Sequence, residues 1–159
     1  MITLERALGH TAWADDKLFA QVASMDAAAL ATRHGTDGRS VAGLLVHIVG
    51  GAQWYRFLLG GGMYTDLAKP TTGAQVLALG AHLREVNQFL LGAVAQPDAQ
   101  VTFEDENGPG SALRSTLLSQ AAYHSVEHRT QIACTLECAG LPTVDLDAYD
   151  FWAYEREVG

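Results

Sequence analysis

Two histidines, His124 and His128, stand four residues apart in the stretch AAYHSVEHRTQIACTLEC, which spans residues 121–138. If this stretch is helical, residues four apart are stacked on one face, so both imidazoles can reach one metal ion without backbone distortion. Zinc-type sites use three or four protein ligands. The spacing therefore predicts part of a metal site and requires a further ligand from elsewhere in the chain.

Four stretches carry apolar residues at the spacing of an α-helix, and their predicted bounds are residues 3–24, 40–59, 73–95 and 111–140. Ser40 is the predicted N-cap of the second helix, Thr71 or Thr72 that of the third, and Ser111 that of the fourth. Gly140, followed by a proline two residues later, is predicted to end the fourth helix.

The connecting segments predict little further structure. Asp26 can cap a short extra turn, and residues 101–103 can form a short strand before a turn at residues 107–110. Residues 145–157 are predicted to be a short helix or turn that packs aromatic rings over the other helices. We therefore expect an all-α fold: one four-helix bundle over residues 1–159, with a short C-terminal helical segment and a small irregular or hairpin-like crossover between the third and fourth helices.

His47 lies in the second predicted helix and should point inward. It shares a face with Leu44, Gly51, Trp54 and Leu58. A single buried histidine is more often satisfied by hydrogen bonds, because an unpaired buried polar group costs about 1–3 kcal/mol. Three inward histidines in one region favour a shared partner such as a metal ion. His47 is therefore the candidate third ligand, since bundles build cofactor sites from facing helices.

Three neutral imidazoles would leave coordination positions open on the ion, so a water or a substrate thiol could be activated there as hydroxide or thiolate. Gln131 lies one turn beyond His128 and could orient that water or substrate, or simply bond to a neighbouring helix. Glu127 could act as a base or as a carboxylate behind a ligand. The alternatives for Glu127 are a solvated side chain or an ion pair with Arg129 or Arg6.

Aromatic and sulfur side chains complete the set of candidates. Trp13, Trp54 and Tyr55 could wall a pocket, although aromatic residues at helical spacing more often belong to the core. Cys134 and Cys138 fall on one predicted helix and are expected to be free thiols, packed as small buried apolar groups.

Two other kinds of metal site fit the sequence less well. The segment from His124 to His128 also matches H-x-x-E-H, the motif of inverted zincin proteases, in which the glutamate acts as a base. Five residues with two free positions are weak evidence, however, and a small bundle has no room for a protease cleft. A di-iron carboxylate bundle needs Glu-x-x-His pairs on two helices, and the sequence has no such pair.

Composition limits the partners. The formal net charge is −8, from 18 acidic residues against 10 lysines and arginines, and the basic residues are scattered, so nucleic acid is excluded as a partner. The N-terminus does not resemble a signal peptide, and the longest uncharged stretch, residues 40–55, is too short to span a membrane. We expect a cytoplasmic protein that acts on small molecules.

Sequence motifs along the whole chain resemble those of the DinB-like superfamily of small bacterial metal-binding four-helix bundles, which includes thiol-dependent S-transferases and the N-terminal domains of maleylpyruvate isomerases. The matching segments are WADDKL at residues 13–18, LLVHIV at 44–49, HSVEHRTQ at 124–131 and GLP at 140–142, with Asp145 and Tyr149. The most specific of them is HxxxHRxQ combined with an upstream helical histidine.

The resemblance implies that His47, His124 and His128 bind a divalent metal ion. The sequence departs from the superfamily at His10, where tyrosine is frequent, and at Asp15, where asparagine is common. These departures bear on substrate contacts more than on the metal.

Two functional classes follow. One is a metal-dependent enzyme, a thiol S-transferase or a hydrolase, that uses zinc, nickel or iron with a low-molecular-weight thiol as candidate co-substrate. The alternative is a non-catalytic, metal-stabilised, stress-associated dimeric bundle; we expect a homodimer in either case. An open coordination position that faces a cleft would favour the enzyme, whereas a closed site with four protein ligands would favour the non-catalytic bundle.

Overall fold

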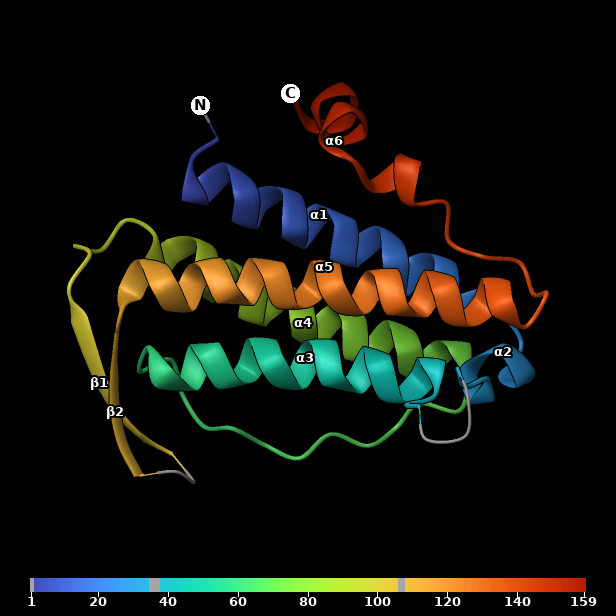
Figure 1. Cartoon of the computed structure of the whole chain (residues 1–159), viewed down its shortest axis with the longest axis horizontal. Helices are drawn as coiled ribbons and strands as arrows, with labels where there is room; N and C mark the ends of the chain where they lie inside the picture. The colour runs from blue at the N-terminus through green and yellow to red at the C-terminus, as the bar shows by residue number, and fades with distance from the viewer. Residues whose placement is uncertain (1, 35–37, 106–107) are drawn as a thin grey trace.

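The computed structural model describes residues 2–34, 38–105 and 108–159. Within these ranges, four long helices lie side by side along the molecule (Figure 1), namely α1 (Leu4–Ala23), α3 (Val41–Leu58), α4 (Gly73–Ala93) and α5 (Arg114–Cys138). Helix α1 packs against α4 and α5, and α3 packs against the same two helices. The expected all-α bundle is confirmed, and α5 contacts both α1 and α3.

The first three long helices begin at side-chain caps, of which Ser40 and Thr72 were expected. Thr3, Ser40 and Thr72 each accept a hydrogen bond from the backbone N–H three residues further on, which satisfies a donor that the helix leaves free. Helix α3 ends just before Gly60, and α5 ends just before Gly140. Both glycines have positive φ angles, +80° and +67°, a conformation that glycine adopts without steric cost.

Three short helices complete the helical part of the fold in the residues that the structure describes: α2 (Ala27–Ala31), the 3₁₀ helix η1 (Leu146–Tyr149) and α6 (Phe151–Val158). Asp26 caps α2 as expected. The C-terminal segment lies over α1 in Figure 1, where the ring of His10 stacks on Phe151 at 4.1 Å between centroids. His10 Nε2 also lies 2.7 Å from the carbonyl oxygen of Tyr149. The expected packing of C-terminal aromatic rings on the bundle is confirmed at these contacts.

The crossover between α4 and α5 is an antiparallel hairpin of β1 (Gln100–Asp105) and β2 (Gly108–Leu113). The expected turn at residues 107–110 was wrong in its extent, because Pro109 and Gly110 pair with Glu104 and Phe103 as part of β2; Asn107 lies outside the described residues. A two-stranded hairpin has only edge strands, which tolerate proline. A Cβ atom on Gly110 would lie 2.5 Å from the Phe103 ring, so this position needs glycine.

The expected N-cap of α5 at Ser111 was also wrong. Ser111 is paired with Thr102 in the hairpin, so the backbone stays extended through Leu113 and the helix begins at Arg114. The carboxylate of Asp98 replaces the missing cap, because it accepts hydrogen bonds from the backbone N–H of Ser115 at 2.9 Å and from its hydroxyl at 2.8 Å. The cap of α5 therefore comes from the segment between α4 and β1, on the other side of the hairpin.

Leucine and isoleucine fill the centre of the bundle, and the largest fully buried side chains include Leu18, Leu45, Ile48, Leu83, Leu90, Leu118, Ile132 and Leu136. Cys134 and Cys138 are free thiols, as expected, but both are exposed, so their expected burial was wrong. They lie on positions of α5 that its neighbours leave uncovered. None of the helices formed by the described residues combines the length and apolarity needed to cross a membrane.

Candidate metal centre

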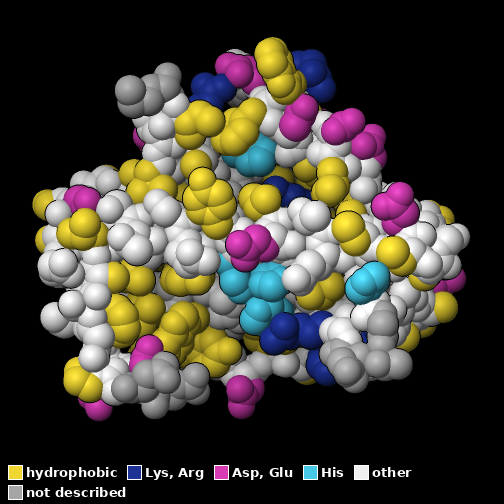
Figure 2. Space-filling view, in the orientation of Figure 1, with side chains coloured by type: hydrophobic (Ala, Val, Ile, Leu, Met, Phe, Trp, Pro, Cys, Tyr) yellow, Lys and Arg dark blue, Asp and Glu magenta, His cyan; other side chains and the backbone are white. Residues whose placement is uncertain are grey.

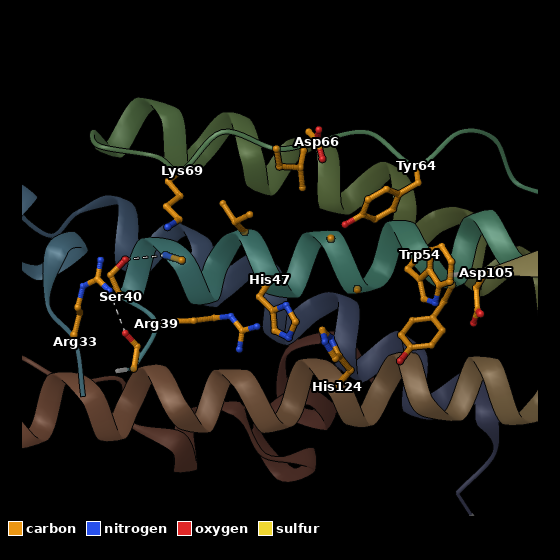
Figure 3. A pocket seen from close by; sticks show the side chains of 17 residues that line it. Arg33, Arg39, Ser40, His47, Trp54, Tyr64, Asp66, Lys69, Asp105 and His124 are labelled. Carbon is orange, nitrogen blue, oxygen red and sulfur yellow. Dashed lines mark hydrogen bonds between the residues drawn. The ribbon is translucent and has the colours of Figure 1, made fainter. Parts of the chain in front are cut away.

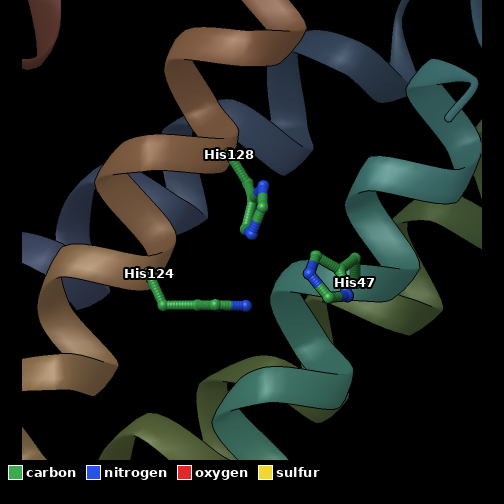
Figure 4. A group of neighbouring side chains, drawn as sticks. All are labelled: His47, His124 and His128. Atoms are coloured by element: carbon green, nitrogen blue, oxygen red, sulfur yellow. The ribbon is translucent and has the colours of Figure 1, made fainter. Parts of the chain in front are cut away.

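Helices α3 and α5 bring three histidines together. His47 comes from α3, His124 and His128 come from α5, and their imidazoles point into the space between the two helices (Figure 4). One ligand nitrogen from each ring lies within 4.8 Å of the others. Among the described residues this is the only group of three or more histidine, cysteine or carboxylate side chains with such spacing. The three residues named from sequence spacing are thus neighbours.

The three rings surround a common space and do not form a parallel stack. The ring centroid of His47 lies 4.9 Å from that of His124 and 4.3 Å from that of His128, and the two α5 rings are 4.4 Å apart. The ring planes are inclined to one another by 58°, 71° and 75°. Inclined rings can direct their nitrogens toward one point, which a metal ion requires.

Electrostatics keep two of these rings neutral. Burial, the Arg39 guanidinium and His128 lower the pKa of His47 from 6.5 to about 4. Burial and the neighbouring His128 and His47 lower the pKa of His124 to about 4, with a smaller effect of Arg39. A neutral imidazole is the form that binds a metal ion. At neutral pH both rings are therefore in the form that binds metal.

The third ring is oriented by a residue from its own helix. Nδ1 of His128 lies 2.7 Å from Oε1 of Gln131. An amide oxygen only accepts hydrogen bonds, so Nδ1 carries the proton and donates it, which leaves the lone pair on Nε2. Metal-binding histidines commonly use this arrangement, in which the distal N–H is held by a polar partner. The structure therefore gives Gln131 a contact with His128, while its catalytic role stays a prediction.

Glu127, the second residue expected to act in catalysis, is exposed on α5 and does not belong to the histidine group. Burial of Tyr55 raises the pKa of its hydroxyl, and the charge of Glu127 raises it further. The arginines considered as its partners bind elsewhere: Arg129 pairs with Asp15, and Arg6 pairs with Glu155. A catalytic role for Glu127 stays a prediction.

A glycine makes room for one of the histidines. A Cβ atom on Gly51 would lie 2.2 Å from Cε1 and 2.6 Å from Nδ1 of His124. Gly51 is one turn from His47 on α3, so the absence of a side chain there lets the His124 ring approach α3. Gly51 was expected on the same face as His47, but the periodicity of one helix does not show that a ring from α5 approaches that face so closely.

A buried polar network fixes the face of α5 next to that of the two histidines. The carboxylate of Asp15 on α1 accepts hydrogen bonds from the Ser125 hydroxyl and, at 3.1 Å, from the Asn87 amide on α4. Nη1 of Arg129 lies 3.7 Å from the same carboxylate. Ser125 and Arg129 each follow one residue after an α5 histidine, so anchoring them to α1 sets the rotation that turns His124 and His128 toward α3.

The histidines adjoin an open cleft of about 980 Å³, into which His47 and His124 project (Figure 3). The expected pocket residues Trp54 and Tyr55 line this cleft. Trp13 does not, because its indole N–H donates to Glu157 and its ring packs against Tyr154. Asp15 is fully buried and lines no part of the cleft. The departure from the superfamily at Asp15 therefore affects packing around α5.

A four-helix bundle in which facing helices present three histidines is a class of protein that can hold a metal ion in its interior. The model of the DinB family matches residues 1–157, so the chain belongs to the DinB family. A comparison with curated proteins found no match.

Proposed function

We propose that this protein is a metal-dependent enzyme in which His47, His124 and His128 hold one divalent ion, zinc, nickel or iron, and act on a small molecule in the adjoining cleft. The observation that carries the proposal is the combination of three histidines with an open cleft. Structural zinc sites use four protein ligands, whereas catalytic sites use three and leave one position for water or substrate.

The donor set fits such an ion. The group contains imidazoles alone, which suit zinc, nickel and iron. The lowered pKa of His47 and of His124 keeps those rings unprotonated at neutral pH, and Gln131 fixes the proton of His128 on the nitrogen away from the ion. His47 and His124 therefore lose no proton when they bind metal at neutral pH.

The chain's own residues position the reactants. An ion bound by neutral ligands supplies a Lewis acid that lowers the pKa of a water or thiol nucleophile. The cleft beside His47 and His124 admits the second reactant, and the Tyr55 ring, 6.2 Å from the ring of His124, limits the space around it. The proposed reactions are transfer of a low-molecular-weight thiol to an electrophile, or hydrolysis of a small substrate.

The proposal is tested by turnover in matched protein samples. Protein loaded with zinc, nickel or iron is incubated with low-molecular-weight thiols and a chloronitrobenzene electrophile, and in parallel with a nitrophenyl ester. We expect loss of thiol or release of nitrophenol with loaded protein, and neither with metal-free protein or the His128→Ala variant. His34→Ala, an exposed histidine outside the group, is the control and should retain activity.

Equal rates in loaded and metal-free protein would contradict the enzyme proposal. Stoichiometric metal binding that raises the thermal midpoint without any turnover would favour the alternative, a metal-stabilised and stress-associated dimeric bundle.

A further inference from the structure

We propose that the cleft beside the three histidines recognises a small molecule with an anionic group, a carboxylate or a phosphate, which binds to Arg33, Arg39 and Lys69, and an apolar part, which lies against Trp54, Tyr55 and Tyr64. The inference rests on the proposed function in one respect, because it places the reacting atom of the ligand at the histidines, between its anionic group and its apolar part.

Three cationic side chains from separate segments converge at one end of the cleft. Arg33 is brought beside Ser40 by an isolated antiparallel bridge, and Arg39 directly precedes Ser40. Lys69 comes from the connection between α3 and α4, and its Cε lies 3.9 Å from the position of a Cβ on Gly43, over the first turn of α3. Figure 3 shows all three at the same end, with Arg39 extending toward His47.

The cations at this end have few partners. Arg33 donates to the carbonyl oxygen of Gly38 at 3.3 Å, whereas Arg39 and Lys69 make no hydrogen bond or ion pair with any residue that the structure describes. The charge of Arg39 lies close to the site, because its side chain lines the same cleft as His47 and His124 and extends toward His47 (Figure 3). Unpaired guanidinium and ammonium groups in a concave site favour an anionic ligand.

The local charge is opposite to that of the whole chain. Three of the ten lysines and arginines line this cleft although the protein carries a formal charge of −8. Two carboxylates, Asp66 and Asp105, also line it, but Figure 3 shows Asp105 beside Trp54 at the other end and Asp66 pointing away from the histidines. The positive charge is therefore confined to one end, where it can orient a ligand.

Aromatic rings form the other end. Trp54 and Tyr64 pack edge to face with 5.9 Å between ring centroids, and Tyr55 lies beside His124. In Figure 2, on the same face, yellow hydrophobic side chains lie on one side of the cyan histidines and dark blue basic side chains on the other. Such rings bind apolar and aromatic groups through their faces and edges.

The segment that carries Tyr64 and Lys69 is held in place. Gln53, which is fully buried in α3, accepts a hydrogen bond from the Thr65 hydroxyl at 3.0 Å and donates to the Thr65 carbonyl oxygen at 3.3 Å. Both ends of the cleft are thus attached to the same helix. A site on a fixed scaffold loses less entropy when it binds a ligand.

The order along α3 defines the shape of the ligand. Arg39 and Ser40 precede the helix, His47 lies near its middle and Trp54 is one turn before its end. At about 1.5 Å per residue, the distance from Ser40 to Trp54 is roughly 21 Å. An elongated molecule with an anionic group at one end and an apolar group at the other spans the histidines in one orientation only.

Binding of matched probes tests the inference. Calorimetry on the protein, both zinc-loaded and metal-free, compares 8-phenyloctanoate and 8-phenyloctyl phosphate with the uncharged 8-phenyloctanol. Because a charge-assisted hydrogen bond contributes about 1.5–3 kcal/mol, we expect each anion to bind about tenfold or more tightly than the alcohol. The anion that binds more tightly identifies the preferred group as a carboxylate or a phosphate.

Variants assign the binding to its residues. Arg39→Gln and Lys69→Gln should each weaken anion binding about tenfold without affecting the alcohol. Arg156→Gln makes the same charge change on α6, outside the cleft, and should have no effect. Trp54→Leu should weaken all three probes. Equal affinity for anions and alcohol, or equal effects of the Arg39 and Arg156 substitutions, would overturn the inference.

The metal-free sample separates this inference from the proposed function. Anion binding that depends on Arg39 in metal-free protein supports the inference even if no turnover is found. Turnover that depends on the histidines, with no preference for anionic probes in either sample, would leave the proposed function intact and exclude the anionic ligand.

Discussion

Oε1 of Gln131 lies 2.7 Å from Nδ1 of His128, one turn further along the same helix. Gln131→Ala removes this acceptor, so the ring can adopt the other tautomer or rotate away from the ion. Loss of such a partner commonly weakens metal binding about 10- to 100-fold. We expect that loss in a zinc competition titration, with Thr130→Ala as a neighbouring control that keeps full affinity. Unchanged affinity in Gln131→Ala would mean that the contact does not hold the ring.

Adjacent glycines on α3 allow a paired test of the space around His124. Gly51→Ala places a methyl group 2.2 Å from the His124 ring, whereas at Gly50 the nearest atom is the Tyr64 hydroxyl, at 3.4 Å. Both substitutions favour the helix by about 1 kcal/mol because alanine is the better helix former. We expect Gly51→Ala to lower zinc affinity and Gly50→Ala to retain it. If both variants bound zinc equally, His124 would not need this space.

The buried Asp15 carboxylate compensates the charge of Arg129, which is 4% exposed. Asp15→Ala leaves that charge without its partner, and breaking a buried pair in this way costs about 3–5 kcal/mol. Urea denaturation measures the loss in free energy of unfolding. The double variant Asp15→Leu/Arg129→Met removes both charges and should recover most of the stability. A loss of about 1 kcal/mol or less in Asp15→Ala would show that the pair does not stabilise the contact between α1 and α5.

The lowered pKa values of His47 and His124 predict a dependence of stability on pH. Each ring has a pKa of about 4 in the folded protein, against an ordinary value of 6.5, so between these two pKa values the unfolded chain binds more protons. The metal-free protein should therefore lose stability as the pH falls from 6.5 toward 4.

A histidine double variant provides the comparison for this pH dependence. In His47→Gln/His124→Gln, the thermal midpoint of the metal-free protein should fall less over the same range of pH. Burial raises the pKa of Asp15 to about 6, which has the opposite effect but is common to both proteins. Parallel curves for the two proteins would contradict the lowered pKa values.

Helical spacing was sufficient to predict the bundle and the grouping of His47, His124 and His128, because periodicity determines which residues share a face. It could not predict the start of α5. Ser111 is a good cap by type, but pairing with Thr102 keeps it extended, and the actual cap, Asp98, lies across the hairpin. A strand pairing depends on residues distant in sequence, which local propensity does not include.

The environment of the histidines was less predictable than their positions. Arg33, Arg39 and Lys69 reach the cleft from irregular segments, and no sequence period indicates where such segments run. Cys134 and Cys138 were expected to be buried, yet they are exposed because α5 is covered on only part of its circumference.

The central claim, that one ion is held by the three histidines, is tested most directly by anomalous scattering from crystals of protein prepared with one equivalent of zinc. The account predicts a single peak bound by His47, His124 and His128, with no fourth protein ligand. A zinc ion bound elsewhere, a fourth protein ligand or the absence of zinc at these rings would contradict it.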